Sequence, residues 1–261
     1  IRAGLNVTVI EALAFGEGAS SRSGGGVSAG VNIGKGISGG PGQSKKFARD
    51  KTLLKNLMLE SLSAFELVEK LVKEEKIECH FERRGRFIGA VTKQHYEEMK
   101  AKADYLNEVI NVGARLVPQA EQHEEIGGNF YFGGMVIERA AKLHPSLFHR
   151  GLLNACYKAG VKLCSHTKVE RIKRYRGNFE IITDNGKTKA EHVIIATNGY
   201  TGELSPNLRK HIVPISSQII VTENLPKEIA AELIPKGRTI SESSRITSYY
   251  RLLPGDRRVM Y

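Results

Sequence analysis

The 261-residue sequence has no tryptophan and only three cysteines, Cys79, Cys156 and Cys164. An odd number of cysteines in no C-x-x-C pattern argues against a disulfide framework and favours a reducing, cytoplasmic compartment. The sequence also lacks any apolar run close to the roughly 18 residues of a membrane-spanning helix, and it shows no signal-peptide pattern. Because no initiator methionine is present, a targeting segment ahead of the chain stays an open possibility.

Positive charge is in excess, with 39 Lys and Arg residues against 28 Asp and Glu residues and a net charge of +11. Such an excess raises the hypothesis of nucleic-acid binding. The basic residues are scattered and interleaved with Glu, without a basic helix or an aromatic RNA-binding pattern, which favours a solvated basic surface. Attraction of an anionic substrate or cofactor is the second interpretation. Hydrophobic residues make up 41% of the chain, enough for a substantial core in one or two domains.

The most informative stretch runs from Leu5 to Gly30. It predicts a buried strand that ends at Ile10, followed by Glu11 and a glycine-rich loop. In a dinucleotide-binding βαβ unit the second strand ends on an acid that binds the ribose hydroxyls, and Glu11 stands at that position. The glycine fingerprint for the pyrophosphate lies about 20 residues before such an acid. We therefore expect the fingerprint upstream and the chain to be a fragment.

A rival fingerprint lies within the same stretch. Gly24, Gly26 and Ala29 satisfy G-x-G-x-x-A, with Asp50 near the expected distance of the acid. That motif requires a strand directly before it and a second strand leading to the acid. The predicted strand ends too early and no second strand is indicated, so the context favours Glu11.

The element pattern further along the chain is mixed. Helical periodicity covers residues 44–76 and 93–112, and a third helix begins at 144–146 and is closed by Gly160. Hairpins are predicted around Arg84-Gly85 and Asn185-Gly186, the second with the Asn-Gly pair that tight turns prefer. A buried parallel strand is predicted at 192–196. Residues 135–141 are interpreted as a link, the aromatic residues 130–132 as core, and strands are expected within 212–221, 246–253 and 259–261.

Three segments carry a family resemblance: VIEALAFGEGASSRSGGGVSAG, LHPSLFHRGLLNACYKAGVKLCSHTKVERIKR and AEHVIIATNGYTGELSPNLRKHIVPISSQIIVTENL. In this order they resemble FAD-dependent oxidoreductases of the D-amino-acid oxidase superfamily, and within it the gamma-glutamylputrescine oxidoreductase-like branch. Ser23 departs from that branch, which usually has Asn there. The resemblance implies an α/β fold in which an FAD-binding Rossmann-like βαβ domain is interleaved with a sheet-rich α+β substrate domain. We expect residues 1–76 and 139–208 in the first domain, and residues 77–138 and 209–261 in the second.

The resemblance also implies an FAD site. Glu11 would bind the ribose, and Val169 would hold the adenine ring through its main chain. The glycine-rich loop would lie along the pyrophosphate and the isoalloxazine edge, and the residues at the end of the 192–196 strand would lie beside the FAD. These residues are Ser20, Ser21, Arg22, Gly24 and Gly25 in the loop, and Ala196, Thr197 and Gly199 after the strand.

For the substrate, the resemblance makes Tyr249 and Arg251 the candidates. Arg251 either forms a bidentate pair with a carboxylate or lies exposed on an antiparallel strand, and the sequence leaves both open. We expect no metal, and we name no catalytic base, because in such enzymes the chemistry belongs to the cofactor.

The implied reaction is oxidation of a C–N bond of a small amine or amino acid. A hydride passes to the flavin, the imine is hydrolysed, and O2 or another acceptor reoxidises the flavin. One alternative is a flavin dehydrogenase of the same fold that acts on a hydroxy acid or polyol with a quinone acceptor. The other is a non-catalytic, basic nucleic-acid-binding protein. We expect no nucleic-acid partner and no integral membrane segment, and the chain alone could be inactive without the phosphate-binding turn.

Overall fold

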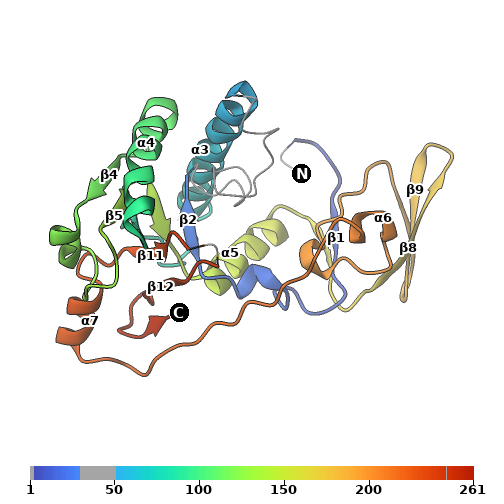
Figure 1. Ribbon diagram of the computed structural model, residues 1–261. Helices are drawn as coiled ribbons and strands as arrows, with labels where there is room; N and C mark the ends of the chain where they lie inside the picture. Colours follow the sequence, from blue (N-terminus) through green and yellow to red (C-terminus); the bar gives the residue numbers. More distant parts are fainter. Residues whose placement is uncertain (1–2, 30–50, 245) are drawn as a thin grey trace. The chain divides into compact units, whose positions relative to one another are not determined.

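The computed structural model describes residues 3–29, 51–244 and 246–261, with only the backbone of Lys51 (Figure 1). The chain forms two compact units, and each is built from two separate stretches. Unit 1 comprises residues 1–23 and 149–218, and unit 2 comprises residues 24–148 and 219–261. The assignment of an FAD-binding and a substrate-binding domain to particular stretches stays a prediction.

Unit 2 is built on a six-stranded sheet with the strand order β13-β12-β11-β3-β5-β4 in the described part of the chain. The strands are β3 (Arg86–Gly89), β4 (Ala114–Val117), β5 (Gly134–Ile137), β11 (Thr239–Glu242), β12 (Tyr249–Leu252) and β13 (Val259–Met260). The β3 strand pairs in parallel with β11 and antiparallel with β5. The C-terminal stretch therefore joins the same sheet as the middle of the chain.

Two long helices, α3 (Lys51–Glu74) and α4 (Lys93–Ile110), pack against each other and cover one face of this sheet (Figure 1). Side chains alternate between the two faces of a strand. In β3, Ile88 joins the cluster under the helices, whereas Phe87 joins a second cluster on the opposite face. Burial of each such side chain stabilises the fold by about 1.5–3 kcal/mol, so both faces contribute to the core.

The two ends of the α4 helix are determined by capping residues. Thr92 is its N-cap, and its Oγ1 accepts a hydrogen bond from the His95 N–H at 3.1 Å. Asn111 ends the helix in the left-handed region, with φ of +41°. Within the last turn of the helix, the Asn107 side chain bonds both the N–H and the carbonyl of Ala114 at 2.7 Å, which fixes the start of β4 against the helix.

The remaining elements of unit 2 lie around the sheet. The second face carries the cluster that contains Ile126 and Ile234, which follow short helices. Two short strands pair antiparallel beside the sheet. These elements are η2 (Gln119–Glu124), α7 (Lys227–Leu233), β2 (Gly26–Ser28) and β6 (Ala140–Lys142).

Unit 1 contains a parallel strand pair and an antiparallel meander. The pair is β1 (Thr8–Ile10) with β7 (Lys162–Cys164), and the meander has the order β10-β9-β8. Helix α5 (Pro145–Lys158) begins in unit 2 and ends in unit 1. The other elements are β8 (Val169–Tyr175), β9 (Asn178–Thr183), β10 (Gly186–Ala190), η1 (Ala19–Ser21), η3 (Asn198–Tyr200) and α6 (Pro206–Arg209).

Locally determined elements were predicted well. Helices α3, α4 and α5 lie within the ranges that their periodicity indicated, although residues 44–50 of the first range lie outside the described residues. Gly160 follows α5 with a φ of +81°. The Asn185-Gly186 hairpin is confirmed, with Gly186 opposite Thr183 in the β9-β10 pair. Within the described ranges, none of the helices has the length and apolar character needed to cross a bilayer.

Two predictions of buried strands were wrong. The opening strand begins at Thr8 and is largely exposed, with Leu5 exposed by 65%. Residues 192–196 form no strand, and Ile194 is 91% exposed. A buried parallel strand needs neighbouring strands and covering helices. Among the described residues, β1 pairs only with β7 and the 192–196 run pairs with no strand.

Three further predictions failed because the partners are distant in sequence. The hairpin at Arg84-Gly85 was wrong: Gly85 donates to the Ala140 carbonyl, and β3 pairs with β5 and β11. Residues 135–141 are not a link but form most of β5 and β6. Of residues 212–221, only Val221 makes a bridge, to Met260.

The rival fingerprint at Gly24 to Ala29 is also excluded. Residues 26–28 form β2, which pairs with β6 in register Gly26 to Lys142. A phosphate-binding fingerprint requires a turn that leads into a helix. Its proposed acid, Asp50, lies outside the described residues.

Candidate functional site

Glu11 directly follows β1 in unit 1. Its N–H donates to the Cys164 carbonyl at 2.8 Å, and its carbonyl accepts from the Thr167 N–H at 2.9 Å. These bonds hold Glu11 at the carboxyl end of the parallel β1-β7 pair, where α/β sheets bind their ligands. The carboxylate accepts one hydrogen bond, from the Leu13 N–H to Oε1 at 3.0 Å. Among the described residues, Oε2 has no hydrogen-bond partner.

Val169 lies close to Glu11 through the same loop. It begins β8, two residues after Thr167, whose N–H bonds the Glu11 carbonyl. The Lys168 N–H donates to Asp184 Oδ1 at 3.0 Å, which fixes the start of this strand. Unit 1 therefore places the predicted ribose-binding residue, Glu11, and the predicted adenine-binding residue, Val169, beside the same loop.

The loop after Glu11 folds into the short helix η1, which carries Ser20 and Ser21. The Ser21 hydroxyl donates to the Gly16 carbonyl. The guanidinium of Arg22 pairs with Glu17, with an Nη2–Oε2 distance of 2.8 Å. Sequence reasoning missed Glu17, although an acid five residues before an arginine in a tight loop was a usable signal.

Ala196, Thr197 and Gly199 lie at the turn that contains η3, also in unit 1. The Thr197 hydroxyl hydrogen-bonds the Thr201 hydroxyl at 2.6 Å. A Cβ placed on Gly18 would lie 3.7 Å from the ring of Tyr200, so this turn lies against the glycine-rich loop. The structure therefore brings together the two segments that were expected to border the cofactor in unit 1.

Gly24 and Gly25 belong to unit 2. Gly25 has a φ of +66°, and a Cβ there would lie only 2.3 Å from the Leu143 carbonyl oxygen and 2.8 Å from Arg251 Nη2. The Gly25 carbonyl accepts from the Leu143 N–H at 2.9 Å. Both the backbone angle and the close approach require glycine at this position. Gly24 is less constrained, since among the described residues its added Cβ would meet only the Met260 side chain, at 3.6 Å.

Arg251 lies on β12 and is only 3% exposed, so its interpretation as an exposed arginine was wrong. Its Nη2 donates to the Leu143 carbonyl at 3.0 Å. Its Nε and Nη1 are buried without a hydrogen-bond partner in the described part of the chain. Burial lowers the pKa of Arg251, against the opposing effect of the Glu82 charge. A buried guanidinium with two unused donors is suited to bind a carboxylate or another anionic oxygen.

Tyr249 precedes Arg251 by two residues in the same strand and is 51% exposed. The Arg86 guanidinium lies over its ring at 6.0 Å from the centroid. Between the two candidates, Tyr250 bonds the Tyr131 hydroxyl at 2.9 Å. Tyr131 is buried against Phe87, which confirms the core interpretation for this residue. For Phe130 that interpretation was wrong, because its side chain is 78% exposed.

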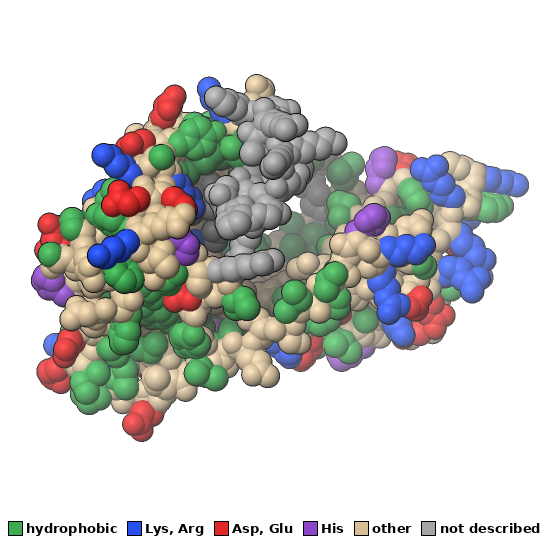
Figure 2. All heavy atoms as spheres, in the orientation of Figure 1, with side chains coloured by type: hydrophobic (Ala, Val, Ile, Leu, Met, Phe, Trp, Pro, Cys, Tyr) green, Lys and Arg blue, Asp and Glu red, His purple; other side chains and the backbone are tan. Residues whose placement is uncertain are grey.

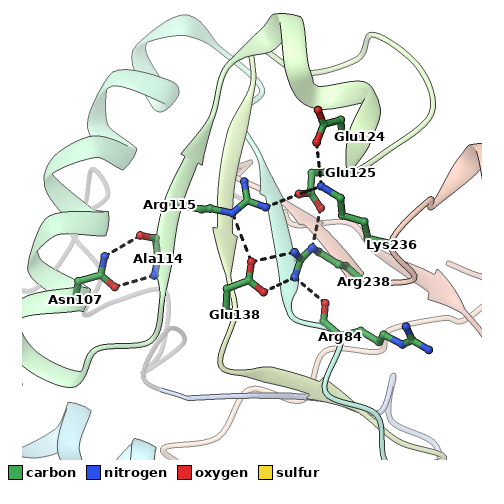
Figure 3. Close-up of polar contacts among 9 residues, drawn as sticks. All are labelled: Arg84, Asn107, Ala114, Arg115, Glu124, Glu125, Glu138, Lys236 and Arg238. Atoms are coloured by element: carbon green, nitrogen blue, oxygen red, sulfur yellow. Dashed lines mark hydrogen bonds and ion pairs between the residues drawn. The ribbon is translucent and has the colours of Figure 1, made fainter.

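A separate polar network lies at the β4, β5 and β11 strands of unit 2 (Figure 3). Buried Glu125 accepts hydrogen bonds from Arg115 at 2.7 Å, Lys236 at 3.0 Å and Arg238 at 2.7 Å. Arg238 also forms a two-point pair with Glu138, at 2.9 and 3.0 Å. The network is internally paired and holds distant segments together, so we assign it a structural role. Within the described ranges, no group of three or more His, Cys, Asp or Glu side chains could hold a metal.

Comparison with known families identifies the class of the chain. A family model described as "FAD dependent oxidoreductase" matches residues 1–260. The chain belongs to this family, and the resemblance found in the sequence is confirmed. FAD, the predicted cofactor, is the cofactor in the family's description.

Two curated relatives cover nearly all of the chain. Gamma-glutamylputrescine oxidoreductase of Escherichia coli strain K12 is 27% identical over 267 residues, which cover 99% of this chain and 59% of the relative. Probable oxidoreductase OrdL of Haemophilus influenzae is 26% identical over 265 residues, again 99% of this chain and 59% of the relative. The chain thus spans about three fifths of the length of these relatives.

Solved structures support the fold. Glycine oxidase from Geobacillus kaustophilus matches with a TM-score of 0.73 and 18% identity, covering 99% of this chain and 64% of that one. L-proline dehydrogenase from P. horikoshii matches with a TM-score of 0.72 and 16% identity, covering 99% and 63%. The predicted α/β fold with a sheet-rich part is confirmed by these similarities and by the strands of unit 2.

Each unit, taken by itself, contains residues that suit part of a cofactor or substrate. In unit 1, the free carboxylate oxygen of Glu11 is available to a ribose hydroxyl. In unit 2, the backbone at Gly25 leaves no room for a Cβ, and Arg251 has unused donors beside it. The space beside Gly25 is filled by Leu143 and Arg251 of the chain itself, whereas the unused donors of Arg251 suit an anionic oxygen of a cofactor or substrate.

Proposed function

We propose that the full-length protein is an FAD-dependent oxidoreductase that oxidises a C–N bond of an amine or amino acid. One observation carries the proposal: Glu11 stands at the carboxyl end of a parallel strand and before the glycine-rich loop, in a chain that matches the family from residue 1 to residue 260. The similarity to gamma-glutamylputrescine oxidoreductase supports a substrate that contains an amine.

In unit 1 we assign the cofactor contacts as follows. Glu11 binds the ribose hydroxyls through Oε2, and the Val169 main chain holds the adenine ring. The serine hydroxyls, the Arg22 guanidinium and the turn at 196–199 bind along the rest of the cofactor. Arg22 can meet a phosphate only if its exposed pair with Glu17 opens. Such exposed pairs contribute only about 0–1 kcal/mol.

In unit 2 we assign Gly24 and Gly25 to the close approach of the loop to the flavin. Arg251 binds a carboxylate oxygen of the substrate through Nη1 or Nε, the two donors that have no hydrogen-bond partner among the described residues. Tyr249 contributes a partly exposed phenol on the same strand. An arginine suits a carboxylate because it is always charged and its planar guanidinium offers several N–H donors in fixed directions.

When bound, FAD supplies the acceptor for the hydride that leaves the carbon next to the substrate nitrogen. Water then hydrolyses the resulting imine to a carbonyl compound and releases the amine. The residues named here bind and orient; none is assigned as a base. The acceptor that takes the electrons from the reduced flavin is O2 or another compound; one of the similar folds is an L-proline dehydrogenase. A cytoplasmic location and the absence of a nucleic-acid partner stay predictions.

The test begins with the visible spectrum of the purified full-length protein, where bound flavin is observed directly. Under anaerobic conditions amines should bleach the flavin, and hydroxy acids and polyols should not. Glu11→Gln should weaken FAD binding about tenfold, as expected for one lost charge-assisted hydrogen bond. Glu170→Gln, exposed on β8, is the control. No flavin after reconstitution would refute the proposal, and bleaching only by hydroxy acids would establish the alternative dehydrogenase.

A further inference from the structure

Lys142 is an unusual residue to find inside unit 2. It lies on β6 and is only 4% exposed. Its backbone exchanges two hydrogen bonds of 2.9 Å with Glu82, and its ammonium group pairs with the Glu82 carboxylate at 3.6 Å. Burial lowers the pKa of Lys142, and the nearby Glu82 charge opposes this effect. A buried ammonium is costly unless it is well paired, so its position calls for an explanation.

The Lys142 side chain borders an open cavity of about 630 Å³, which lies entirely within unit 2. A Cβ on Gly237, another lining residue, would lie 3.8 Å from the Lys142 Nζ. The walls come from the segment before β3, from α7 and from the turn between β12 and β13. Five basic and two acidic residues line the cavity: Arg84, Lys142, Lys227, Lys236 and Arg257, with Glu82 and Asp256.

The two acidic side chains that line the cavity already form ion pairs with basic residues of the chain. Glu82 is shared between Lys142 and Arg84, which lies 3.1 Å from the same oxygen. Asp256 pairs with Arg258 outside the cavity lining, with its Oδ2 2.6 Å from the Arg258 Nε. The Glu82 carboxylate therefore pairs with both the buried Lys142 and the exposed Arg84.

Most of the basic side chains that line the cavity have N–H donors that are not used within the described residues. Lys236 is held by Glu124 and Glu125, and Figure 3 shows it directed into that network. The Arg84 guanidinium points away from the network in the same view, although its carbonyl belongs to it. Lys227 makes no ion pair among the described residues, and Arg257 uses only its Nε, on the Leu225 carbonyl. The cavity thus has an excess of positive charge, which a concave surface concentrates.

We propose that this cavity binds a small organic anion with a phosphate or carboxylate group above Lys142. The buried Lys142 meets the anion inside the cavity, and the exposed Arg84, Lys227 and Arg257 meet it at the rim. The bound anion supplies the second negative charge that the Lys142–Glu82–Arg84 cluster lacks. Its chemistry is independent of the proposed oxidation, and the proposal does not rest on it.

The test is calorimetric titration of the FAD-loaded full-length protein with pyrophosphate and with citrate at constant ionic strength. Loading with FAD keeps pyrophosphate out of the cofactor site. We expect saturable binding of at least one probe, and the one that binds identifies phosphate or carboxylate as the recognised group. Lys142→Met should weaken it about tenfold or more, because a buried charged donor is lost.

Two further variants make the result decisive. Lys227→Met, at the exposed rim, should weaken binding about threefold without affecting the fold. Lys100→Met changes an exposed lysine on α4, outside the cavity, and should bind like the wild type. No saturable binding of either probe would overturn the proposal. So would an unchanged Kd in both Lys142→Met and Lys227→Met, or equal weakening in Lys100→Met.

Discussion

The Glu125 carboxylate and the Arg238 guanidinium meet inside unit 2 with an Oε2–Nε distance of 2.7 Å, although they lie on segments far apart in the sequence. Glu125 is fully buried and Arg238 is 7% exposed. Burial alone would raise the pKa of Glu125, but the hydrogen bonds from Lys236 and Arg115 and the charge of Arg238 lower it. The pair therefore joins the segment after η2 to the start of β11 as a charged contact.

Replacing this carboxylate should destabilise the protein. Glu125→Gln leaves three basic groups around an uncharged amide. Each keeps one other acid, Glu138 for Arg115 and Arg238 and Glu124 for Lys236, but loses its pair with the buried carboxylate. We expect a loss of about 2–3 kcal/mol in the free energy of unfolding, measured by urea denaturation. Glu124 is an exposed neighbour whose one ion pair in the described part of the chain is with Lys236, so Glu124→Gln should change this free energy by less than about 0.5 kcal/mol. Equal midpoints for the two variants would refute the structural role.

The Glu69–Arg83 pair should make stability depend on acid pH. The hydrogen bond from Arg83, opposed by burial and helped by Lys73, lowers the pKa of Glu69 from 4.5 to about 2. Because the folded state holds the charged form, the pair's contribution is complete above about pH 4.5 and is lost as the pH falls towards 2. We expect about 1 kcal/mol, since Arg83 is 45% exposed and its charge is screened.

Urea denaturation at several pH values between 5 and 2 measures this contribution. Glu69→Gln and Arg83→Gln should each flatten the decline, whereas Glu66→Gln on the same helix should keep it. If the free energy of unfolding of both pair variants fell with pH as steeply as that of the wild type, other groups would be responsible for the acid sensitivity.

The two neighbouring glycines offer a matched test of the loop. Gly25→Ala forces a Cβ onto the Leu143 carbonyl at a positive φ, so we expect a loss of at least about 2 kcal/mol in stability and reduced flavin retention. Gly24→Ala places its Cβ at an ordinary contact distance and should be tolerated. Flavin absorbance per protein and urea denaturation measure both effects. Similar behaviour of the two variants would contradict the close approach at Gly25.

Arg251 should determine recognition of a carboxylate. Arg251→Lys keeps the charge but loses the planar guanidinium and its fixed donors, so the KM for amines that carry a carboxylate should rise about tenfold or more. The KM for amines without a carboxylate should change little. Arg258→Lys, exposed and paired with Asp256 on the adjacent turn, is the control. An equal rise for both kinds of amine would remove Arg251 from substrate recognition.

Local patterns in the sequence were sufficient for several elements. The three- and four-residue spacing of α3 and α4, the closing Gly160 and the Asn185-Gly186 turn depend on neighbouring residues alone. For the candidate site, the sequence provided Glu11 from its position after a strand. The other site residues came from the family resemblance, and their roles stay predictions.

Strand pairing could not be predicted in the same way. Gly85 was interpreted as a hairpin turn, but its N–H bonds Ala140, and β3 lies between β5 and β11. Ile194 belongs to an apolar run that resembles a buried strand, yet no strand pairs with it in the described residues. Apolar character favours burial, but the burial depends on partners that the run itself does not specify.

The sequence by itself determined the family, the cofactor and the helices, because these depend on motifs and periodicity within short stretches. Only the tertiary structure decided that Arg251 is buried with unused donors, that Gly25 is pressed against Leu143, and that Lys142 borders a cavity rich in positive charge. Burial and hydrogen-bond partners are set by segments that meet in space, and their meeting leaves no pattern in either segment alone.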